Sequence, residues 1–325
     1  MKLLKIVPDH TNIDFVRLRG WAFGLTLALS VLAIALVGIK GLNFGVDFVG
    51  GLMIEQRFAD VPSQNRVREV VDAQGAGEAQ LQPFGGDGRT LTIRLPAQQG
   101  ADEGATNAVV RKVTTALSRE FPGSTFSRYS TVSGKVSGEL IRNGMIAVLL
   151  AVLGIGLFAI VRFEWQFGVS TVVAIAHDLI MTLGFFAITQ FEVDLNIVAA
   201  FLTIIGYSIN DKIVIDDRIR ENMRRYRKMD MREIIDLSVN ETLPRTVMTS
   251  VTILLALVAL LFLGGHVLRG FTAAMTLGII VGTYSSIYVS SSLLISLGLR
   301  ANPDRDRTVR LGKDAGEAER VTPRG

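Results

Sequence analysis

Two aspartates lie within long apolar segments of this sequence, where a charged side chain is costly. Asp178 follows His177 in the run AIAHDLIMTLG, and Asp211 follows Asn210 in the run TIIGYSINDKIVI. An ionisable group inside a membrane span is expensive to bury, so a functional role is the default hypothesis for it. Because a buried carboxylate can gain and lose a cation, these residues indicate ion or proton transfer within a membrane.

A guanidinium is expected at the depth of Asp211. If the apolar segment begins near Leu195, Asp211 lies about 24 Å along it. Arg245 follows Pro244 at the start of the next apolar segment, so it should lie at a similar level, where the two residues could meet. Burial disfavours a charged carboxylate and a nearby guanidinium favours it, and effects of similar size would leave Asp211 titratable near neutral pH. Protonation would then release Arg245.

Each candidate also has a structural explanation. The role of Asp211, Asn210 and Ser208 could be limited to joining helices by hydrogen bonds. The same explanation is stronger for Asp178. Two further acids are expected at the aqueous end of the segment, in ion pairs with neighbouring arginines: Asp216 and Asp217, with Arg218 or Arg220.

Small residues recur at every fourth position of the last apolar segment. A stripe of this kind lets another helix approach closely, so we expect it to serve helix packing. Its members are Ala274, Gly278, Gly282, Ser286 and Ser290.

The composition excludes several kinds of chemistry. The chain has no cysteine, so it has no disulfide, thiol nucleophile or thiolate metal site. Its three histidines, His10, His177 and His266, are far apart in sequence, so we expect no histidine metal cluster. We also find no nucleophile–base pair or phosphate-binding loop in the polar region, and therefore expect neither an enzyme nor a bound cofactor.

Six apolar segments must position these residues. The first, Trp21 to Ile39, contains nineteen residues without a charge, and the others lie at about 144–161, 167–188, 195–215, 247–264 and 271–299. Nineteen helical residues span about 28 Å, close to the ~30 Å hydrocarbon core of a bilayer. No small-x-small cleavage site follows the first segment, so an uncleaved anchor is favoured over a signal peptide.

Basic residues predict the orientation of the six spans. They cluster before the first span, between the fourth and fifth, and in the tail, whereas loop 189–194 has none and loop 264–270 has only Arg269. This asymmetry places both termini in the cytoplasm. The net charge of +4 therefore reflects topology and contacts with lipid headgroups of the bilayer, and nucleic acid is not an expected partner.

A polar region of about ninety residues separates the first two spans. We expect a cytoplasmic N-terminus at 1–20, a first span at 21–39, an external domain at 40–139, the other five spans at 140–299 and a disordered cytoplasmic tail at 300–325. Within the domain the pattern predicts strands at 48–58, 79–84, 90–95 and 125–132 and helices at 62–74 and 103–121, with a turn at Gly85-Gly86. This βαββαβ order is that of an α+β ferredoxin-like domain.

Seven ordered motifs between about residues 20 and 299 resemble those of the SecF family. In chain order they are Phe44-Gly-Val-Asp-Phe-Val-Gly-Gly51, Phe163-Glu-Trp165, Ala176-His-Asp178, Gly206-Tyr-Ser-Ile-Asn-Asp211, Asp217-Arg-Ile-Arg-Glu-Asn222, Glu241-Thr-Leu-Pro-Arg-Thr246 and Ile279 to Tyr288.

The resemblance implies a half of an RND-superfamily membrane protein and a subunit of the SecDF complex of the bacterial inner membrane. Such a subunit would use the proton motive force, or sodium in some relatives, to promote export of unfolded preproteins with a SecD-type subunit and the SecYEG translocon. By motif, Asp211 and Arg245 match the family's essential intramembrane pair. Two departures stand out: Lys212, where many relatives have a small polar residue, and Gly134-Lys135, where relatives often have Gly-Pro.

Two other functions remain as alternatives. The first is an ion-driven exporter half of the same superfamily for a small molecule or lipid, which the small external domain disfavours. The second is an intramembrane aspartyl enzyme using Asp178 and Asp211. Arg245 would oppose the shared proton that such chemistry needs.

Overall fold

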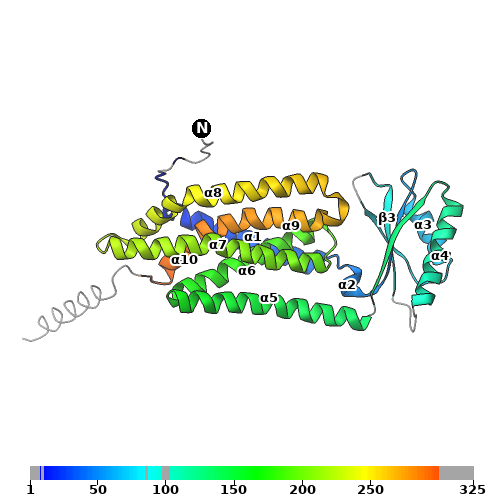
Figure 1. The fold of residues 1–325 in the computed structure, drawn as a ribbon, viewed down its shortest axis with the longest axis horizontal. Helices are drawn as coiled ribbons and strands as arrows, with labels where there is room; N and C mark the ends of the chain where they lie inside the picture. The colour runs from blue at the N-terminus through cyan, green and yellow to red at the C-terminus, as the bar shows by residue number, and fades with distance from the viewer. Residues whose placement is uncertain (1–7, 9–10, 85–86, 97–102, 133, 300–325) are drawn as a thin grey trace, which may run out of the picture.

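The structure, a computed structural model, describes residues 8, 11–84, 87–96, 103–132 and 134–299. A helical bundle forms most of the molecule, and a small α+β domain lies at one end of it (Figure 1). Within the described residues, six helices are long and apolar enough to cross a membrane. The expected fold class, six membrane helices with an α+β domain between the first two, is confirmed.

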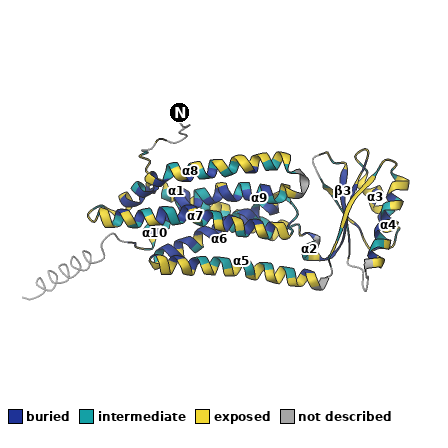
Figure 2. Cartoon of the chain, in the orientation of Figure 1, coloured by how far each residue is buried: buried dark blue, intermediate teal, exposed yellow. Residues whose placement is uncertain are grey.

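The bundle contains three inner and three outer helices. In α6 (Trp165–Thr189), α7 (Leu195–Arg225) and α9 (Gly265–Tyr284) about half or more of the membrane-spanning window is buried, whereas α1 (Arg19–Lys40), α5 (Gly134–Arg162) and α8 (Met231–Leu263) are largely exposed (Figure 2). The sixth span continues from α9 through a π-helical segment, η2 (Ser285–Ser290), into α10 (Ser291–Ser296). Exposed apolar faces of the outer helices suit lipid tails or partner helices.

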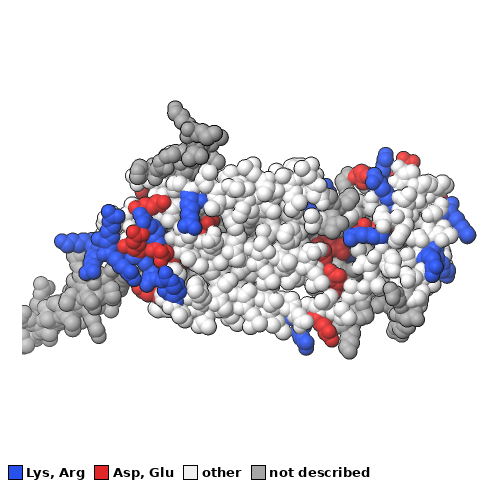
Figure 3. Space-filling model, in the orientation of Figure 1, with Lys and Arg blue, Asp and Glu red and all other residues white. Residues whose placement is uncertain are grey.

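Charged side chains gather at the two ends of the bundle (Figure 3). An almost uncharged belt lies between them on the face shown, as expected for a hydrocarbon environment. We call the end beside the α+β domain the domain end. The opposite end is called the basic end, after the basic residues at the end of α7, in the loop that follows and at the start of α8: Arg218, Arg220, Arg224, Arg225, Arg227, Lys228 and Arg232.

The α+β domain has the element order β1 (Gly51–Arg57), α3 (Gln64–Asp72), β2 (Gln80–Phe84), β3 (Thr90–Leu95), α4 (Glu103–Glu120) and β4 (Thr125–Val132). The strands lie in the order β2-β3-β1-β4 and every neighbouring pair is antiparallel, which is the ferredoxin-like arrangement. Alternate residues of the inner strands, such as Ile54 and Ile93, are fully buried beneath α3 and α4. The opposite face of the sheet is turned toward the bundle.

The predicted start of the first strand is wrong. The first strand was expected from Phe48, but Val46–Val49 form a short helix, α2, and β1 begins at Gly51. Gly50 and Gly51 have φ of 76° and 114°, a backbone region that favours glycine, and they redirect the chain between the two elements. The expected turn at Gly85-Gly86 and the expected tail at 300–325 lie outside the described residues.

Candidate functional site

Asp211 is a buried carboxylate within a membrane-spanning helix. It lies on α7 and is only 4% exposed. Within the described part of the chain, its Oδ2 atom has no hydrogen-bond partner. Because a buried polar atom normally has a partner, an unpartnered carboxylate oxygen is the kind of group that binds a proton, a cation or water.

A chain of hydroxyl groups fixes the side of α7 that carries Asp211. Tyr207 Oη lies 3.0 Å from Ser250 Oγ on α8, which lies 2.8 Å from Thr283 Oγ1 on α9. The helices α7 and α8 are antiparallel, so Asp211, one turn beyond Tyr207, lies level with Thr246, one turn before Ser250. Thr246 is 1% exposed, and its hydroxyl has no hydrogen-bond partner among the described residues.

Arg245 and Asp211, which the sequence indicated could meet, form no ion pair or hydrogen bond with each other among the described residues. Thr246 and Ser250 lie on the buried side of α8, so Arg245, adjacent to Thr246, lies on the exposed side. Arg245 is nevertheless near enough for its charge to act on the carboxylate.

Asn210 lies on the exposed side of α7, away from the packed interior. Gly206 and Thr203 are exposed on the same side, one and two turns toward the domain end. Together with Arg245 they place polar and small groups on one open face formed by α7 and α8. The two residues expected to assist Asp211, Asn210 and Arg245, therefore belong to this open face.

Asp178, in contrast, is fully engaged with neighbouring groups. Ser208 Oγ of α7 donates a hydrogen bond of 2.6 Å to Asp178 Oδ2, and His177 Nδ1 lies 3.1 Å from Asp178 Oδ1. Gly282 of α9 packs against this contact, because a Cβ there would lie 3.1 Å from Ser208 Cβ. This geometry favours the structural explanation for Asp178: it joins α6 to α7.

The small residues of the sixth span pack against α7. A Cβ at Gly278 would lie 2.5 Å from two side-chain carbons of Ile204, so only glycine fits without displacement. Ser286, in η2, donates a hydrogen bond to the Ser208 carbonyl at 3.3 Å. Close packing of α9 and η2 on α7 keeps Ser208 beside Asp178.

A buried ion pair on α7 was missed, and the expected pairing of Asp216 is wrong. Lys212 Nζ lies 2.9 and 2.8 Å from the two carboxylate oxygens of Asp216, and both residues are at most 3% exposed. Asp217 pairs with Arg162 at 3.7 Å rather than with a neighbouring arginine. The i,i+4 spacing of Lys212 and Asp216 is suited to an ion pair on one helix face, but the arginines that follow Asp217 suggested closer partners for Asp216.

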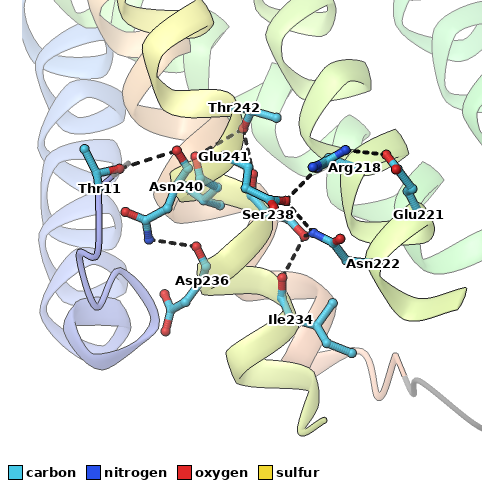
Figure 4. Close-up of polar contacts among 11 residues, drawn as sticks. Thr11, Arg218, Glu221, Asn222, Ile234, Asp236, Ser238, Asn240, Glu241 and Thr242 are labelled. Atoms are coloured by element: carbon cyan, nitrogen blue, oxygen red, sulfur yellow. Dashed lines mark hydrogen bonds and ion pairs between the residues drawn. The ribbon is translucent and has the colours of Figure 1, made fainter. Parts of the chain in front are cut away.

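Motif residues at the basic end have a structural role (Figure 4). Arg218 joins Glu241 of α8 and Glu221 of its own helix at 2.6 Å each, and Asn222 donates to Glu241 at 2.7 Å. These contacts tie the end of α7 to α8. A metal site is not apparent here or elsewhere, because the described residues contain no group of three or more metal-ligating side chains.

Pro244 leaves one backbone carbonyl of α8 without its helical amide donor, and this carbonyl helps to anchor the N-terminal segment. A proline nitrogen cannot donate to the carbonyl four residues earlier, which here belongs to Asn240. Thr11 Oγ1 lies 3.4 Å from that carbonyl, and Asn240 Nδ2 donates to the Ile13 carbonyl at 2.9 Å. Asp236 Oδ1 accepts from the Val16 amide at 2.9 Å. The chain entering α1 is thus held against α8.

Comparison with known families matches both parts of the chain. The family described as "Protein export membrane protein SecD/SecF, C-terminal" matches residues 112–300, and the "SecD/SecF GG Motif" matches residues 35–57. The chain belongs to the SecD/SecF family. The first match contains both intramembrane aspartates and Arg245, and the second contains the passage from α1 into β1.

Curated relatives are similar over nearly the whole chain. Protein translocase subunit SecF of Cereibacter sphaeroides is 41% identical over 309 residues, covering 93% of this chain and 95% of the relative. Protein translocase subunit SecF of Rhodobacter capsulatus is also 41% identical, with 93% and 94% covered. These relatives identify the chain as the SecF-type member of the family.

Solved structures of SecDF share the fold. The crystal structure of SecDF from Thermus thermophilus, titled a translocon-associated membrane protein, has a TM-score of 0.81 and 36% identity, and covers 91% of this chain. SecDF in a super-membrane-facing form has a TM-score of 0.66, also at 36% identity, and covers 97% of this chain. This chain spans 40% and 41% of those two longer chains.

Proposed function

We propose that this chain acts with a SecD-type subunit to couple proton movement across the inner membrane to export of unfolded preprotein through SecYEG. The role is non-enzymatic, and no cofactor other than the coupling ion takes part. One observation carries the proposal: Asp211 is buried within the membrane-spanning helix α7 and, among the described residues, has an unpartnered carboxylate oxygen. The names of the relatives support the translocation role.

The proposed orientation puts the basic end in the cytoplasm and the α+β domain outside. Lys and Arg side chains are densest at the basic end in Figure 3. Basic residues in short loops are retained on the cytoplasmic side during insertion. In this orientation the α+β domain lies on the side where an exported chain emerges.

The open face of α7 and α8 is the proposed contact for the SecD-type subunit. Asn210 and Arg245 are exposed at membrane depth, where polar groups facing lipid are costly. Helices of the partner would cover these groups, and an acidic residue of the partner would be the natural counterpart for Arg245. Asp211 would then lie between the hydroxyl of Thr246 and this interface.

Protonation of Asp211 would change how α7 interacts with its surroundings. A charged carboxylate attracts the guanidinium group of Arg245, whereas a neutral carboxyl group does not. Moving one charge through the membrane potential supplies about 2.3 kcal/mol per 100 mV, enough to shift an equilibrium between two helix arrangements. Gly278 and Gly282 of α9 present no side chain to α7, so α7 could shift along α9 at these positions. Because Ser208 binds Asp178, α6 would move together with α7.

The proposal is tested by preprotein export into vesicles that contain the complex with Asp211→Asn. We expect export driven by the proton gradient to be lost, while insertion of the protein is unchanged. Asp217→Asn is the matched control, because it makes the same substitution on the same helix at an exposed ion pair of 3.7 Å. Replacing the proton gradient with a sodium gradient identifies the coupling ion. Gradient-driven export by Asp211→Asn at the control rate would refute the proposal.

A further inference from the structure

Arg94 joins the α+β domain to two separate segments of the membrane region. Its Nη1 atom donates to Asn43 Oδ1 at 3.1 Å and to the Phe44 carbonyl at 3.0 Å. Its Nη2 atom lies 2.9 Å from Glu192 Oε1. The Arg94 side chain is 14% exposed, so these contacts are largely removed from water. One residue of β3 therefore holds both the linker after α1 and the loop between α6 and α7.

The linker and the loop are also joined to each other. The Gly45 amide donates to the Val193 carbonyl and the Val193 amide to the Asn43 carbonyl, each at 2.8 Å. A Cβ at Gly45 would lie 2.8 Å from Glu192 Oε1 and 3.2 Å from the Val193 carbonyl, so the two backbones approach as closely as glycine allows. The linker and loop thus form one unit, and Arg94 is the cation that connects this unit to the sheet.

The loop bound by Arg94 is the turn of the hairpin that carries both intramembrane aspartates. It connects the end of α6 at Thr189 to the start of α7 at Leu195. The two helices are joined within the membrane by the hydrogen bond from Ser208 to Asp178. A displacement of α6 and α7 along or across the bundle must therefore displace Glu192, the residue that Arg94 binds.

The structure leaves space for the domain to move on this contact. A cavity of about 530 Å³ lies between the open face of the sheet and the domain end of the bundle. Thr92 and Arg128 line it from the sheet, and Gln190, Asn196 and Phe271 line it from the bundle. Beside this cavity, Gln82 Nε2 of β2 also donates to the Gln190 carbonyl at 3.5 Å, so the contacts of Arg94 and Gln82 attach the sheet to the α6–α7 loop at separate points rather than through a continuous packed surface. A localised attachment beside a cavity permits tilting.

We propose that Arg94 is the positioning residue that transmits displacement of the α6–α7 hairpin to the α+β domain. The coupling part of this proposal rests on the proposed function of Asp211. The attachment itself does not, because it follows from the contacts of Arg94 alone. Loss of the guanidinium removes the ion pair with Glu192 and the hydrogen bonds to Asn43 and Phe44, and it widens the range of orientations that the domain samples.

The absence of cysteine allows the attachment to be measured directly. Spin labels are placed at Ser118→Cys on α4 and Leu263→Cys at the end of α8, both exposed. The distance distribution between them is measured by electron–electron double resonance in the complex with the SecD-type subunit, reconstituted in vesicles with and without a proton gradient. Arg57→Ala is the matched control, since Arg57 belongs to the same domain but forms an exposed ion pair with Asp87 at 3.7 Å.

We expect Arg94→Ala to broaden the distance distribution without a gradient and to abolish its response to the gradient, while Arg57→Ala matches the parent. Hydrogen exchange at β1 and β3 in the same samples reports whether the sheet stays folded. If Arg94→Ala unfolds it, Glu192→Lys replaces that variant, because it repels Arg94 from the bundle side, and the same broadening is expected.

Two results separate this inference from the proposed function. A distribution as narrow in Arg94→Ala, or in Glu192→Lys, as in the control overturns the attachment, whatever Asp211 does. If the distances in the parent protein do not respond to the gradient and Asp211→Asn keeps normal gradient-driven export, the proposed function fails. The coupling, which rests on that function, is then overturned as well. If Asp211→Asn loses export while Arg94→Ala keeps a full distance response, only the role of Arg94 in transmission is overturned.

Discussion

Lys212 binds Asp216, one turn along α7, with both carboxylate oxygens of that residue within 2.9 Å of its ammonium group. Asp211, its neighbour in sequence, points elsewhere and keeps an unpartnered oxygen. Consecutive residues of a helix point about 100° apart, which separates the two environments. A cation beside the candidate coupling residue is thereby neutralised within its own helix, and the sequence departure at Lys212 leaves Asp211 free to exchange an ion.

The Lys212–Asp216 pair is expected to behave as a unit. Asp216→Asn leaves a buried ammonium group without its anion, a loss of about 3–5 kcal/mol in the free energy of unfolding. Replacing both residues, as Lys212→Met with Asp216→Leu, removes both charges and should cost far less. Thermal unfolding in lipid nanodiscs measures the difference. Equal stability of the single and double variants would show that the pair contributes nothing to folding.

The glycine stripe of α9 predicts a steric effect at one position and none at a control. Gly278→Ala places a methyl group against Ile204, and overpacking of this kind costs about 1–3 kcal/mol. Gly154→Ala on α5 meets no atom within 4 Å and should leave stability unchanged or raise it. The melting temperatures of both variants test the packing of α9 on α7. Equal melting temperatures for Gly278→Ala and Gly154→Ala would contradict this packing.

Arg245 should be dispensable for folding of the chain and essential for its function. It is exposed and forms no ion pair with a described residue, so Arg245→Met should change stability by less than about 0.5 kcal/mol. Gradient-driven export by the complex should nevertheless be lost, because the cation near Asp211 is absent. Arg218→Met is the contrasting variant, since it breaks contacts with Glu241 and Glu221 and should lower stability. Full export by Arg245→Met would remove Arg245 from the mechanism.

Docking of the α+β domain should depend on external pH. Burial raises the pKa of Glu192 above its ordinary 4.5, and it raises the pKa of Asp194 above 3.8, despite the lowering effect of Arg94 on Glu192. Separation of the domain would expose these carboxyl groups to water and return their pKa values toward the ordinary ones, so the docked state binds protons more tightly than the separated state. Docking free energy is greatest below the ordinary pKa values and falls as pH rises through the raised ones. The other charged groups around this site are Asp47, Arg128 and Arg269.

The pH effect is measured as the width of the same label-to-label distance distribution between pH 4 and pH 8, a range that begins near the ordinary carboxyl pKa of about 4 and extends above it. The distribution should narrow as the pH falls. Glu192→Gln removes the buried charge and should reduce this dependence. A distribution that broadens on acidification would mean that the ion pair with Arg94 outweighs burial, the opposite of the stated order.

The sequence predicted most of the fold because its signals are local. Uncharged blocks of about twenty residues define membrane helices, and the alternation in Thr90–Leu95 defines a strand with the bounds that the structure has. The start of β1 was predicted wrongly because the apolar residues of α2 precede Gly50, and only the positive φ of the glycines separates the two elements. Hydropathy carries no information on φ.

The site was predicted less completely because it depends on which side of a helix each residue faces in the assembled bundle. Asp211 and Asp178 were identified by their type within apolar segments. That Asp178 is satisfied by Ser208, while Asp211 is not, follows from packing around Gly282 and could not be read from either helix alone. The contacts of Arg94 join segments that are distant in sequence, such as Asn43 and Glu192, and no local pattern marks them.

The central claim, that Asp211 gains and loses a proton inside the membrane, is tested most directly by infrared difference spectroscopy of the complex in vesicles. A component of the carbonyl stretch of protonated carboxylic acids should appear when the proton concentration is raised on one side, and this component should be lost in Asp211→Asn. Asp217→Asn should retain the band. A difference spectrum that is identical in the parent and in Asp211→Asn would contradict the account, because the changing proton would then belong to another group.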